Sequence, residues 1–288
     1  MVESGQVSVL IPAFNEEASI GDIVGQVRAA AQWLEVLVVD DNSSDNTREV
    51  ALEAGARVIR HPYNKGNGAA VKTAIREARG EFVLLMDADG QHSPEDMKKL
   101  IQRLDEYDLV VGSRSWEAQA TFSRGAGNAL LARFASFLSG FQIPDLTSGF
   151  RAARRERMAE FLHLFPNGFS YPTTSTLSFL KVGYNVTFVP IDGKQRADKS
   201  KSKMRPWREG GRFLVIIFRM ITLFSPLRIF LPFSAFFFLL GFGYLIYTII
   251  TEVHVTNTSV LLITASAVFF LFGLLSEQVA AAMFRPRQ

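Results

Sequence analysis

The stretch Phe82-Val-Leu-Leu-Met-Asp-Ala-Asp-Gly-Gln-His92 decides the fold, because a buried strand and a pair of acidic side chains meet in it. Residues 82–86 are all apolar, which is typical of a strand that a parallel sheet buries on both faces. Asp87 and Asp89 follow two positions apart, so in extended backbone both carboxylates project from one side. A hard divalent cation, Mg²⁺ or Mn²⁺, could bind there, with Gln91 adding a neutral oxygen. The alternative is that both aspartates are turn residues ahead of a helix.

The first half of the chain repeats a strand, a polar loop and a helix. We expect strands at residues 6–11, 35–40, 56–60, 82–86 and 108–112. Apolar residues at helical spacing follow the first four of these strands. This alternation predicts an α/β fold with a doubly wound, mainly parallel sheet, which binds its ligands at the carboxyl ends of the strands.

Polar residues and glycines that directly follow these strands form the candidate site. They are Asn15, Glu16, Asp40, Asp41, Lys65, Gly66, Gly68, Asp87 and Asp89. Gly66 and Gly68 open a helix whose N–H groups could meet a phosphate, although an ordinary turn and helix start explains them as well. Asp40 and Asp41 are likewise explained as residues that precede a helix. The pattern is neither a P-loop nor a Rossmann dinucleotide fingerprint, which disfavours both classes.

Composition restricts the compartment and the partners. Cysteine is absent from the 288 residues, which excludes a disulfide framework or a thiolate metal site. The N-terminus lacks a basic region ahead of an apolar core, so we expect no signal peptide and a first domain that stays in the cytoplasm. Of the net charge of +3, residues 205–288 carry +4 and residues 1–204 carry −1. A basic tail beside long apolar runs favours an anionic lipid surface, and not nucleic acid, as a partner.

Two uncharged apolar runs predict a membrane anchor. They span residues 229–250 and 256–276, and about 20 residues are enough to cross the hydrocarbon as a helix. Arg219 and Arg228 precede the pair and Arg285 and Arg287 follow it, so the positive-inside rule places both ends in the cytoplasm. Residues 206–224 are amphipathic and predict a helix in the membrane interface, with a further core helix as the alternative.

Several motifs, in their order and spacing, resemble glycosyltransferase family 2 with the GT-A fold. The first three are Ile11-Pro-Ala-Phe-Asn-Glu-Glu17, Val38-Val-Asp-Asp-Asn-Ser-Ser-Asp-Asn-Thr47 and Met86-Asp-Ala-Asp-Gly-Gln-His92. Val111-Gly-Ser-Arg114 and Asp145-Leu-Thr-Ser-Gly-Phe-Arg151 are similar to the dolichol-phosphate mannose synthase and polyprenyl-phosphate glycosyltransferase branch. The resemblance covers roughly residues 6–204 and implies a GT-A domain over residues 1–204. Together with the apolar and amphipathic patterns described above, the predicted organisation adds an interfacial helix over 205–226 and a two-helix anchor over 227–288.

The resemblance also implies roles for individual residues. The nucleotide would meet Pro12, Ala13, Phe14, Glu16, Val39, Asp41 and Asp87. The metal, Mg²⁺ or Mn²⁺, would be held by Asp87, Asp89 and Gln91. Catalytic roles would fall to Asp89, Asp145 and Arg114, and the acceptor phosphate would meet Arg124, Asn128, Arg196 and Lys203. A turn residue is the alternative for Asp145 and a surface charge the alternative for Arg124. The basic loop at 194–204 lacks the glycine of the family pattern, which leaves the register of its lysines open.

The expected activity is transfer of a sugar, with inversion, from a nucleotide sugar to a polyprenyl phosphate. The expected location is a cell membrane, with two spans and the catalytic domain on the cytoplasmic face. One alternative is a processive polysaccharide synthase, although the Gln-x-x-Arg-Trp signature of that group is absent. The other is a membrane-tethered binding protein without catalysis. UDP-glucose, UDP-N-acetylglucosamine and GDP-mannose all stay open as donors, as do dolichyl and undecaprenyl acceptors, and a homo-oligomer is compatible with the sequence.

Overall fold

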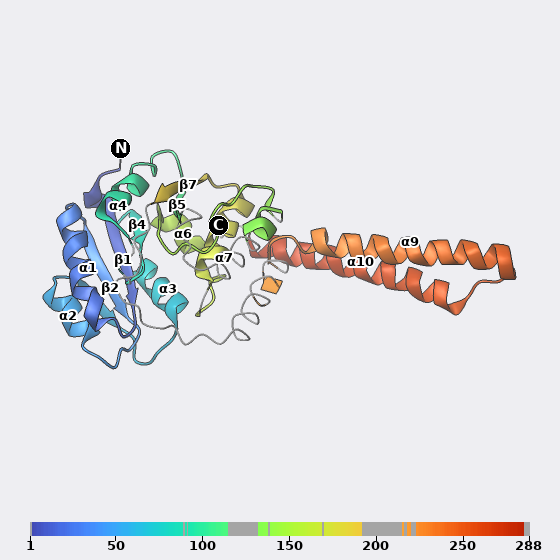
Figure 1. The fold of residues 1–288 in the computed structure, drawn as a ribbon, viewed down its shortest axis with the longest axis horizontal. Helices are drawn as coiled ribbons and strands as arrows, with labels where there is room; N and C mark the ends of the chain where they lie inside the picture. The colour runs from blue at the N-terminus through green and yellow to red at the C-terminus, as the bar shows by residue number, and fades with distance from the viewer. Residues whose placement is uncertain are drawn as a thin grey trace. The chain divides into compact units, whose positions relative to one another are not determined.

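The computed structural model describes residues 2–88, 90, 92–114, 132–137, 139–168, 170–191, 215, 218, 219 and 223–284. The chain forms two compact units, one of Met1–Phe137 with Phe141–Arg205 and one of Leu138–Gly140 with Pro206–Gln288. Figure 1 shows a sheet covered by helices in the first unit and a pair of long helices in the second.

A seven-stranded sheet with the order β3-β2-β1-β4-β6-β5-β7 forms the centre of the first unit. Its strands are β1 (Val7–Ala13), β2 (Glu35–Asp40), β3 (Arg57–Arg60), β4 (Phe82–Leu85), β5 (Leu109–Arg114), β6 (Arg151–Arg154) and β7 (Val186–Ile191). All neighbours pair in parallel except β6, which runs antiparallel to β4 and β5. The predicted α/β class with a mainly parallel sheet is confirmed. The strand–helix alternation of the first half did not predict β6 or β7.

Helices cover both faces of this sheet (Figure 1). On one face lie α1 (Glu17–Ala30), α2 (Thr47–Glu53) and α4 (Pro94–Ile101), and on the other lie α3 (Asn67–Glu77) and α6 (Arg155–Glu160). A 3-10 turn, η1 (Ser4–Gln6), precedes β1, and α7 (Tyr171–Val182) precedes β7. Helix α1 buries Ile20, Ile23, Val24 and Val27, the spacing of an apolar stripe. Helix α4 begins at a proline, and the Ser93 hydroxyl caps it by accepting a hydrogen bond from Asp96 N.

Strand β4 has the buried character that its apolar run predicts. Phe82 and Met86 are at most 3% exposed and the three residues between them are fully buried. Alternate residues of a strand face opposite sides of the sheet. Phe82, Leu84 and Met86 accordingly share one side and belong to the core beneath α1 and α4. Chain connections leave β1 and β4 in opposite directions across the sheet, so the carboxyl ends of these two strands mark the point where α/β sheets bind ligands. Asp87 lies two positions after the last residue of β4, at that point.

Strand β1 is longer than predicted. We expected it to end at Ile11, ahead of Pro12, but it continues to Ala13 and pairs Pro12 with Val39 of β2. On its other side, the pairing with β4 stops at Leu10. A proline is therefore tolerated, because the sheet at Pro12 has only one neighbouring strand.

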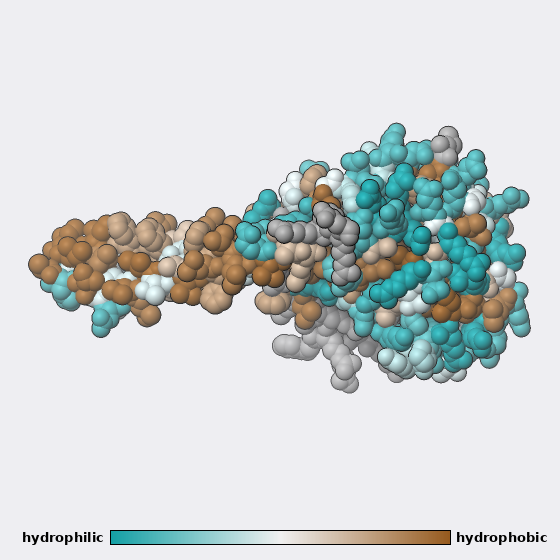
Figure 2. Space-filling model, turned by 180° about the vertical axis from the view of Figure 1, so that it is seen from behind, coloured by the Kyte–Doolittle hydropathy of each residue, from teal (hydrophilic) through white to brown (hydrophobic). Residues whose placement is uncertain are grey.

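The second unit is a helical hairpin of α9 (Pro226–Glu252) and α10 (Asn257–Met283). Both helices have 27 residues, about 40 Å at 1.5 Å per residue, so they are long and apolar enough to cross a membrane. Most of their side chains are exposed, and Figure 2 shows apolar side chains along most of the visible face of the hairpin, with hydrophilic ones near its far end. A core helix of a water-soluble protein would instead be mostly buried. The two predicted apolar runs are thus confirmed as helices that could span a membrane.

Small residues at seven-residue intervals form the seam of the hairpin. The buried ones are Ser234, Gly241 and Thr248 in α9 and Ser259, Ser266, Gly273 and Ala280 in α10. Small side chains allow two helices to approach closely where lipid removes the hydrophobic drive to associate. The Ser234 hydroxyl donates to the carbonyl of Ser266 at 3.0 Å. The predicted interfacial helix at 206–224 falls almost entirely outside the described residues.

Candidate functional site

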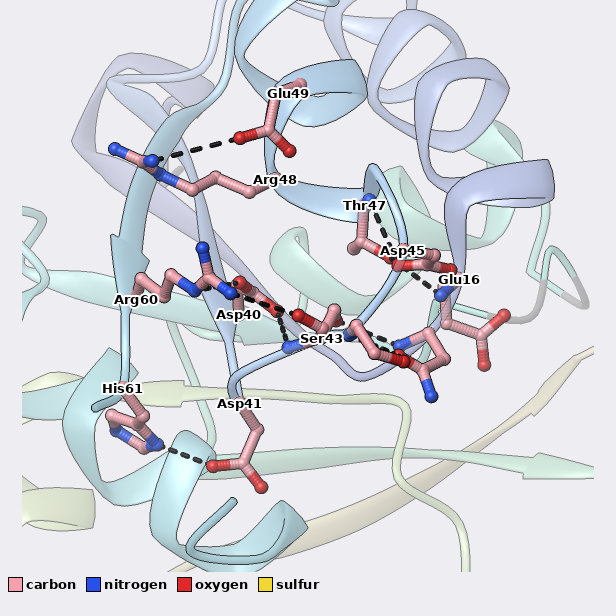
Figure 3. Close-up of polar contacts among 12 residues, drawn as sticks. Glu16, Asp40, Asp41, Ser43, Asp45, Thr47, Arg48, Glu49, Arg60 and His61 are labelled. Atoms are coloured by element: carbon pink, nitrogen blue, oxygen red, sulfur yellow. Dashed lines mark hydrogen bonds and ion pairs between the residues drawn. The ribbon is translucent and has the colours of Figure 1, made fainter. Parts of the chain in front are cut away.

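The loops after β1 and β2 interlock through side-chain to backbone hydrogen bonds (Figure 3). Asn15 N donates to Ser43 Oγ at 2.9 Å, and Ser44 N donates to Asn15 Oδ1 at 2.8 Å. Glu16 N donates to Thr47 Oγ1 at 2.8 Å. Asn15 has a φ of 55°, a left-handed conformation that asparagine tolerates. These hydrogen bonds hold the loops after β1 and β2 to each other at the carboxyl edge of the sheet.

Among the predicted nucleotide contacts, Phe14 is the most accessible. It is 47% exposed, whereas Pro12, Ala13 and Val39 are buried and form the ends of two paired strands. Glu16 is half-buried and accepts a hydrogen bond from Ser19 Oγ at 3.1 Å. The buried residues thus shape the edge, while Phe14 offers an aromatic face to a ligand.

Asp40 and Asp41 are both buried, with different partners (Figure 3). Asp40 Oδ1 accepts from Ser43 N at 2.9 Å, and Asp40 Oδ2 lies 3.4 Å from Arg60 Nε. Asp41 Oδ1 lies 2.6 Å from His61 Nδ1 and also accepts from Lys65 N, while Oδ2 accepts from Gly66 N. The two aspartates fix the loops after β2 and β3. The contact between His61 and Asp41 was not predicted. The signal for it was the position of His61 directly after β3, on the same edge as Asp41.

At the start of α3, the N–H groups that could have met a phosphate have partners within the protein. Gly68 N donates to the carbonyl of Gly168, and Ala69 N donates to the carbonyl of Asn167, both at 2.9 Å. Gly66 N donates to Asp41. A Cβ on Gly68 would lie 2.0 Å from the carbonyl oxygen of Pro166, so close backbone packing explains this glycine. The alternative, an ordinary turn and helix start, describes the segment.

Asp87 lies at the carboxyl end of β4, half-buried against the chain at Gly149. A Cβ on Gly149 would lie 2.7 Å from Asp87 Oδ2. Ser19 Oγ of α1 donates to the carbonyl of Ala88 at 2.9 Å, which fixes the next peptide. Asp89 and Gln91, the other two predicted metal ligands, lie outside the described residues. Within the described part of the chain, no three His, Cys, Asp or Glu side chains gather as a metal site.

Arg114 and Asp145 form an ion pair at the end of β5. Arg114 Nε donates to Asp145 Oδ2 at 2.9 Å, and Nη2 donates to Oδ1 at 3.2 Å. Thr147 N also donates to Oδ1, at 3.0 Å, so Asp145 stabilises its own turn as well. The Asp145 side chain is only 1% exposed, while that of Arg114 is 27% exposed. The arginine therefore presents the charge and the aspartate holds it.

Arg151, at the end of the motif that begins at Asp145, is fully buried. Its Nη1 donates to the carbonyl of Pro172 at 3.0 Å and to Ser175 Oγ at 2.5 Å, and its Nη2 donates to the carbonyl of Ser148. Burial lowers the pKa of Arg151, and the negative charges of Asp145 and Asp87 act in the opposite direction. No role was predicted for Arg151, which ties the turn before β6 to α7.

The four predicted contacts to the acceptor phosphate cannot be placed. Arg124, Asn128, Arg196 and Lys203 all lie outside the described residues. The structure therefore brings together the ends of β1, β2, β4 and β5 and leaves the acceptor side as a prediction.

Comparison with known proteins decides the family. The model of glycosyl transferase family 2 matches residues 8–161, more than half of the chain. The chain belongs to glycosyl transferase family 2. A second model, the GtrB C-terminal hairpin, matches residues 225–282, which contain most of α9 and α10. Membership in family 2 indicates that the chain catalyses a glycosyl transfer. The relatives described next confirm the predicted relationship to the polyprenyl-phosphate branch.

Three curated relatives of this family 2 chain are about one third identical to it. Glycosyltransferase AglJ of Haloferax volcanii is 32% identical over 77% of this chain and 74% of its own length. Dolichyl-phosphate hexose transferase of the same organism is 33% identical over 68% of this chain and 86% of its own. Polyprenol monophosphomannose synthase of Mycolicibacterium smegmatis is 34% identical over 65% and 77%.

Solved structures support the fold of this family 2 chain. Glucosyl-3-phosphoglycerate synthase from Mycobacterium tuberculosis, in complex with Mn²⁺, UDP and glucosyl-3-phosphoglycerate, superposes with a TM-score of 0.61 at 22% identity. The alignment covers 75% of this chain and 78% of that one. At this identity the likeness shows the shared GT-A-like fold.

Proposed function

We propose that this protein transfers a sugar from a nucleotide sugar to a polyprenyl phosphate and inverts the anomeric carbon. The observation that carries the proposal is the position of Asp87 at the carboxyl end of β4, beside the end of β1, in a chain that also carries an exposed apolar hairpin. The carboxyl edge of the sheet is where a nucleoside diphosphate would bind, and the hairpin would hold the protein at the membrane that contains a lipid acceptor. Relatives named for dolichyl-phosphate hexose transfer and polyprenol monophosphomannose synthesis support the same reaction.

The nucleotide would lie along the ends of β1 and β2. Pro12, Ala13 and Val39 would support it, Phe14 would stack against it, and Glu16 and Asp41 would accept its hydrogen bonds. Asp87 would lie toward the diphosphate, because its strand ends where the chain connections diverge. These assignments rest on the geometry of the edge and on the family pattern.

Of the three proposed metal ligands, Asp87 is the one that the structure describes, and its chemistry suits a divalent ion. Asp87 is a half-buried carboxylate on a fixed backbone, and a hard oxygen donor is the ligand that Mg²⁺ or Mn²⁺ prefers. Asp87, Asp89 and Gln91 would hold the ion, which would neutralise charge on the departing diphosphate. The Mn²⁺ in the complex of glucosyl-3-phosphoglycerate synthase is consistent with this choice.

The protein's own side chains would then position the two reactants. An oxygen of the acceptor phosphate forms a bond to the sugar C1, the bond from C1 to the diphosphate oxygen breaks, and the nucleoside diphosphate leaves. A phosphate monoester has a second pKa near 6, so the acceptor is mostly ionised at neutral pH and needs no strong base. Arg114, aimed by Asp145, would stabilise negative charge on a phosphate. Arg124, Asn128, Arg196 and Lys203 would meet the acceptor.

We also propose the arrangement at the membrane. Residues 1–204 would form the catalytic domain on the cytoplasmic face, residues 205–226 an interfacial helix and residues 227–288 an anchor with two spans. The arginines at both ends of the hairpin favour this orientation.

The test incubates the purified full chain, in detergent, with polyprenyl phosphate and labelled UDP-glucose, UDP-N-acetylglucosamine or GDP-mannose. We expect one donor to give a lipid-extractable product carrying a single sugar, and a chelator to abolish it until Mg²⁺ or Mn²⁺ is restored. A polymeric product would instead identify a processive synthase. Absence of any lipid-linked product with all three donors would leave the non-catalytic alternative.

A variant tests the metal ligands separately. We expect Asp89→Ala to abolish transfer while membrane insertion stays intact. Asp105→Ala, which changes an exposed acid after α4, is the matched control and should keep full activity. Near-normal turnover of Asp89→Ala would remove the metal assignment.

A further inference from the structure

The carboxylate of Asp41 has most of its hydrogen-bonding capacity occupied by the protein. A carboxylate offers about four acceptor positions, two on each oxygen. Oδ1 accepts from His61 Nδ1 at 2.6 Å and from Lys65 N at 2.9 Å, which fills it. Oδ2 accepts from Gly66 N at 2.7 Å, so one position on Oδ2 is left within the described part of the chain.

His61 fixes this arrangement from the other side. It is 4% exposed, its backbone N–H donates to the carbonyl of Asp40, and its Nε2 lies 2.9 Å from Thr73 Oγ1 of α3. Because the carboxylate accepts, Nδ1 carries the proton, and in the neutral ring the Thr73 hydroxyl donates to Nε2. The imidazole is held at both nitrogens, so Asp41 Oδ1 cannot turn toward a ligand without breaking this chain of contacts. Figure 3 shows the contact between His61 and Asp41.

Asp41 and Phe14 are the first residues after two paired strands of the same edge. Ala13 of β1 pairs with Asp40 of β2, and Asp41 N donates to the carbonyl of Ala13 at 2.9 Å. Phe14 and Asp41 are the next residues of these two neighbouring strands. Asp41 is only 3% exposed, so little of its carboxylate can be reached by a ligand. A planar base stacked on Phe14 would reach it only with its edge.

We infer that His61 is a positioning residue that leaves Asp41 a single acceptor for the donor's base, and that the donor nucleotide is therefore a uridine diphosphate sugar. This inference rests on the function proposed above. Uracil presents one N–H, at N3, between two carbonyl groups, and matches one acceptor. Guanine presents adjacent donors at N1 and N2, which a carboxylate satisfies best with both oxygens. With Oδ1 filled, the second guanine donor would be left without a partner.

The experiment compares binding of UDP and GDP to the purified full chain in detergent with Mg²⁺, by isothermal titration calorimetry. We expect UDP to bind at least tenfold more tightly. In His61→Ala an acceptor on Oδ1 becomes available, so we expect the ratio of the two Kd values to fall toward one. His61→Asn places an amide donor near the position of Nδ1 and should restore the preference for UDP. His163→Ala, at an exposed histidine, is the matched control.

The outcomes separate this inference from the function on which it rests. Binding of neither nucleotide would count against the proposed function itself. Binding of GDP as tightly as UDP by the wild-type chain would overturn the inference and leave sugar transfer standing. If His61→Ala does not fold, His61→Leu, which fills the space without a donor, takes its place. A purely structural histidine would change the melting temperature without changing the ratio of the two Kd values.

Discussion

The side chains of Arg114 and Asp145 are joined by two hydrogen bonds, from Nε at 2.9 Å and from Nη2 at 3.2 Å. The pair connects the end of β5 with the turn that leads to β6. The aspartate is buried and the arginine is partly exposed, so Asp145 fixes the orientation of the Arg114 guanidinium. It also explains why an aspartate and an arginine 31 positions apart belong to one site.

We predict that Arg114→Lys lowers kcat by about 10- to 100-fold. A lysine keeps the positive charge but cannot make the two-point contact, so its ammonium would be poorly placed for a phosphate. Asp145→Asn should lower kcat in the same direction, because an amide pairs less well with the guanidinium. Steady-state kinetics with the lipid acceptor measures both variants.

Arg154→Lys is the matched control for Arg114→Lys. Arg154 also pairs with an acid, Glu81, at 3.1 Å, but both side chains are exposed and the pair lies at the other end of β6. Exposed pairs contribute little to stability, so this variant should keep normal kinetics. Equal effects of the two variants would show that the Arg114 pair has no special role.

We predict that Gly149→Ala lowers turnover by at least tenfold with little loss of stability. The added Cβ would lie 2.7 Å from Asp87 Oδ2. The end of a side chain moves at low cost, so the fold adapts while the carboxylate leaves its position. Thermal unfolding and turnover at fixed Mg²⁺ measure the two effects. Gly25→Ala in α1, where nothing lies within 4 Å of the added Cβ, should leave turnover unchanged and slightly raise the melting temperature, because alanine favours a helix more than glycine does. A normal rate for Gly149→Ala would place Asp87 outside the reaction.

The fold could be predicted from the sequence because its signals are local. The apolar run at β4 and the polar residues after β1, β2 and β4 each follow from spacing within a few positions. Strand β6 is different, since its Ala152 and Ala153 carry little strand preference and are buried because they pair between β4 and β5. Pairing of this kind depends on distant segments, which a local pattern does not contain.

The site was predictable in outline but not in its supporting contacts. The family pattern points to Asp41, but only the structure shows that His61 and the N–H groups of Lys65 and Gly66 hold it. Arg151 was also missed, because its partners lie on α7, more than 20 positions along the chain. Arginines are mostly exposed, so a fully buried one cannot be inferred from residue type.

We predict a pH-dependent contribution to stability from Glu35. Burial alone raises its pKa, but hydrogen bonds from Arg57, Ser8 and the backbone N–H of Arg79 outweigh burial and hold the pKa below its ordinary value. A lowered pKa in the folded state gives stability that is present above the unfolded pKa of about 4.3 and is lost as the pH falls through the folded pKa.

Glu35→Gln should therefore lower the free energy of unfolding by about 1–2 kcal/mol at pH 7, and the difference from wild type should shrink below about pH 4. Melting temperatures of the full chain in detergent at both pH values measure it. Glu53→Gln, at an exposed position of α2, is the control and should change little. A difference that stays constant down to acidic pH would mean that the charge of Glu35 contributes nothing.

We predict that Gly241→Leu separates the two helices of the hairpin, whereas Gly243→Leu does not. A Cβ on Gly241 would lie 2.7 Å from the Cβ of Leu262, while nothing lies within 4 Å of one on Gly243. Both changes add the same side chain to the same helix, two positions apart, so the added apolar surface is equal. The variants differ only in whether the new side chain lies in the seam between α9 and α10. We expect Gly241→Leu to lower the melting temperature in detergent. We also expect it to lower the fraction of protein that forms a disulfide when Ser234→Cys and Ser266→Cys are introduced together. If both variants behave alike, the close contact of α9 and α10 at this seam does not stabilise the anchor.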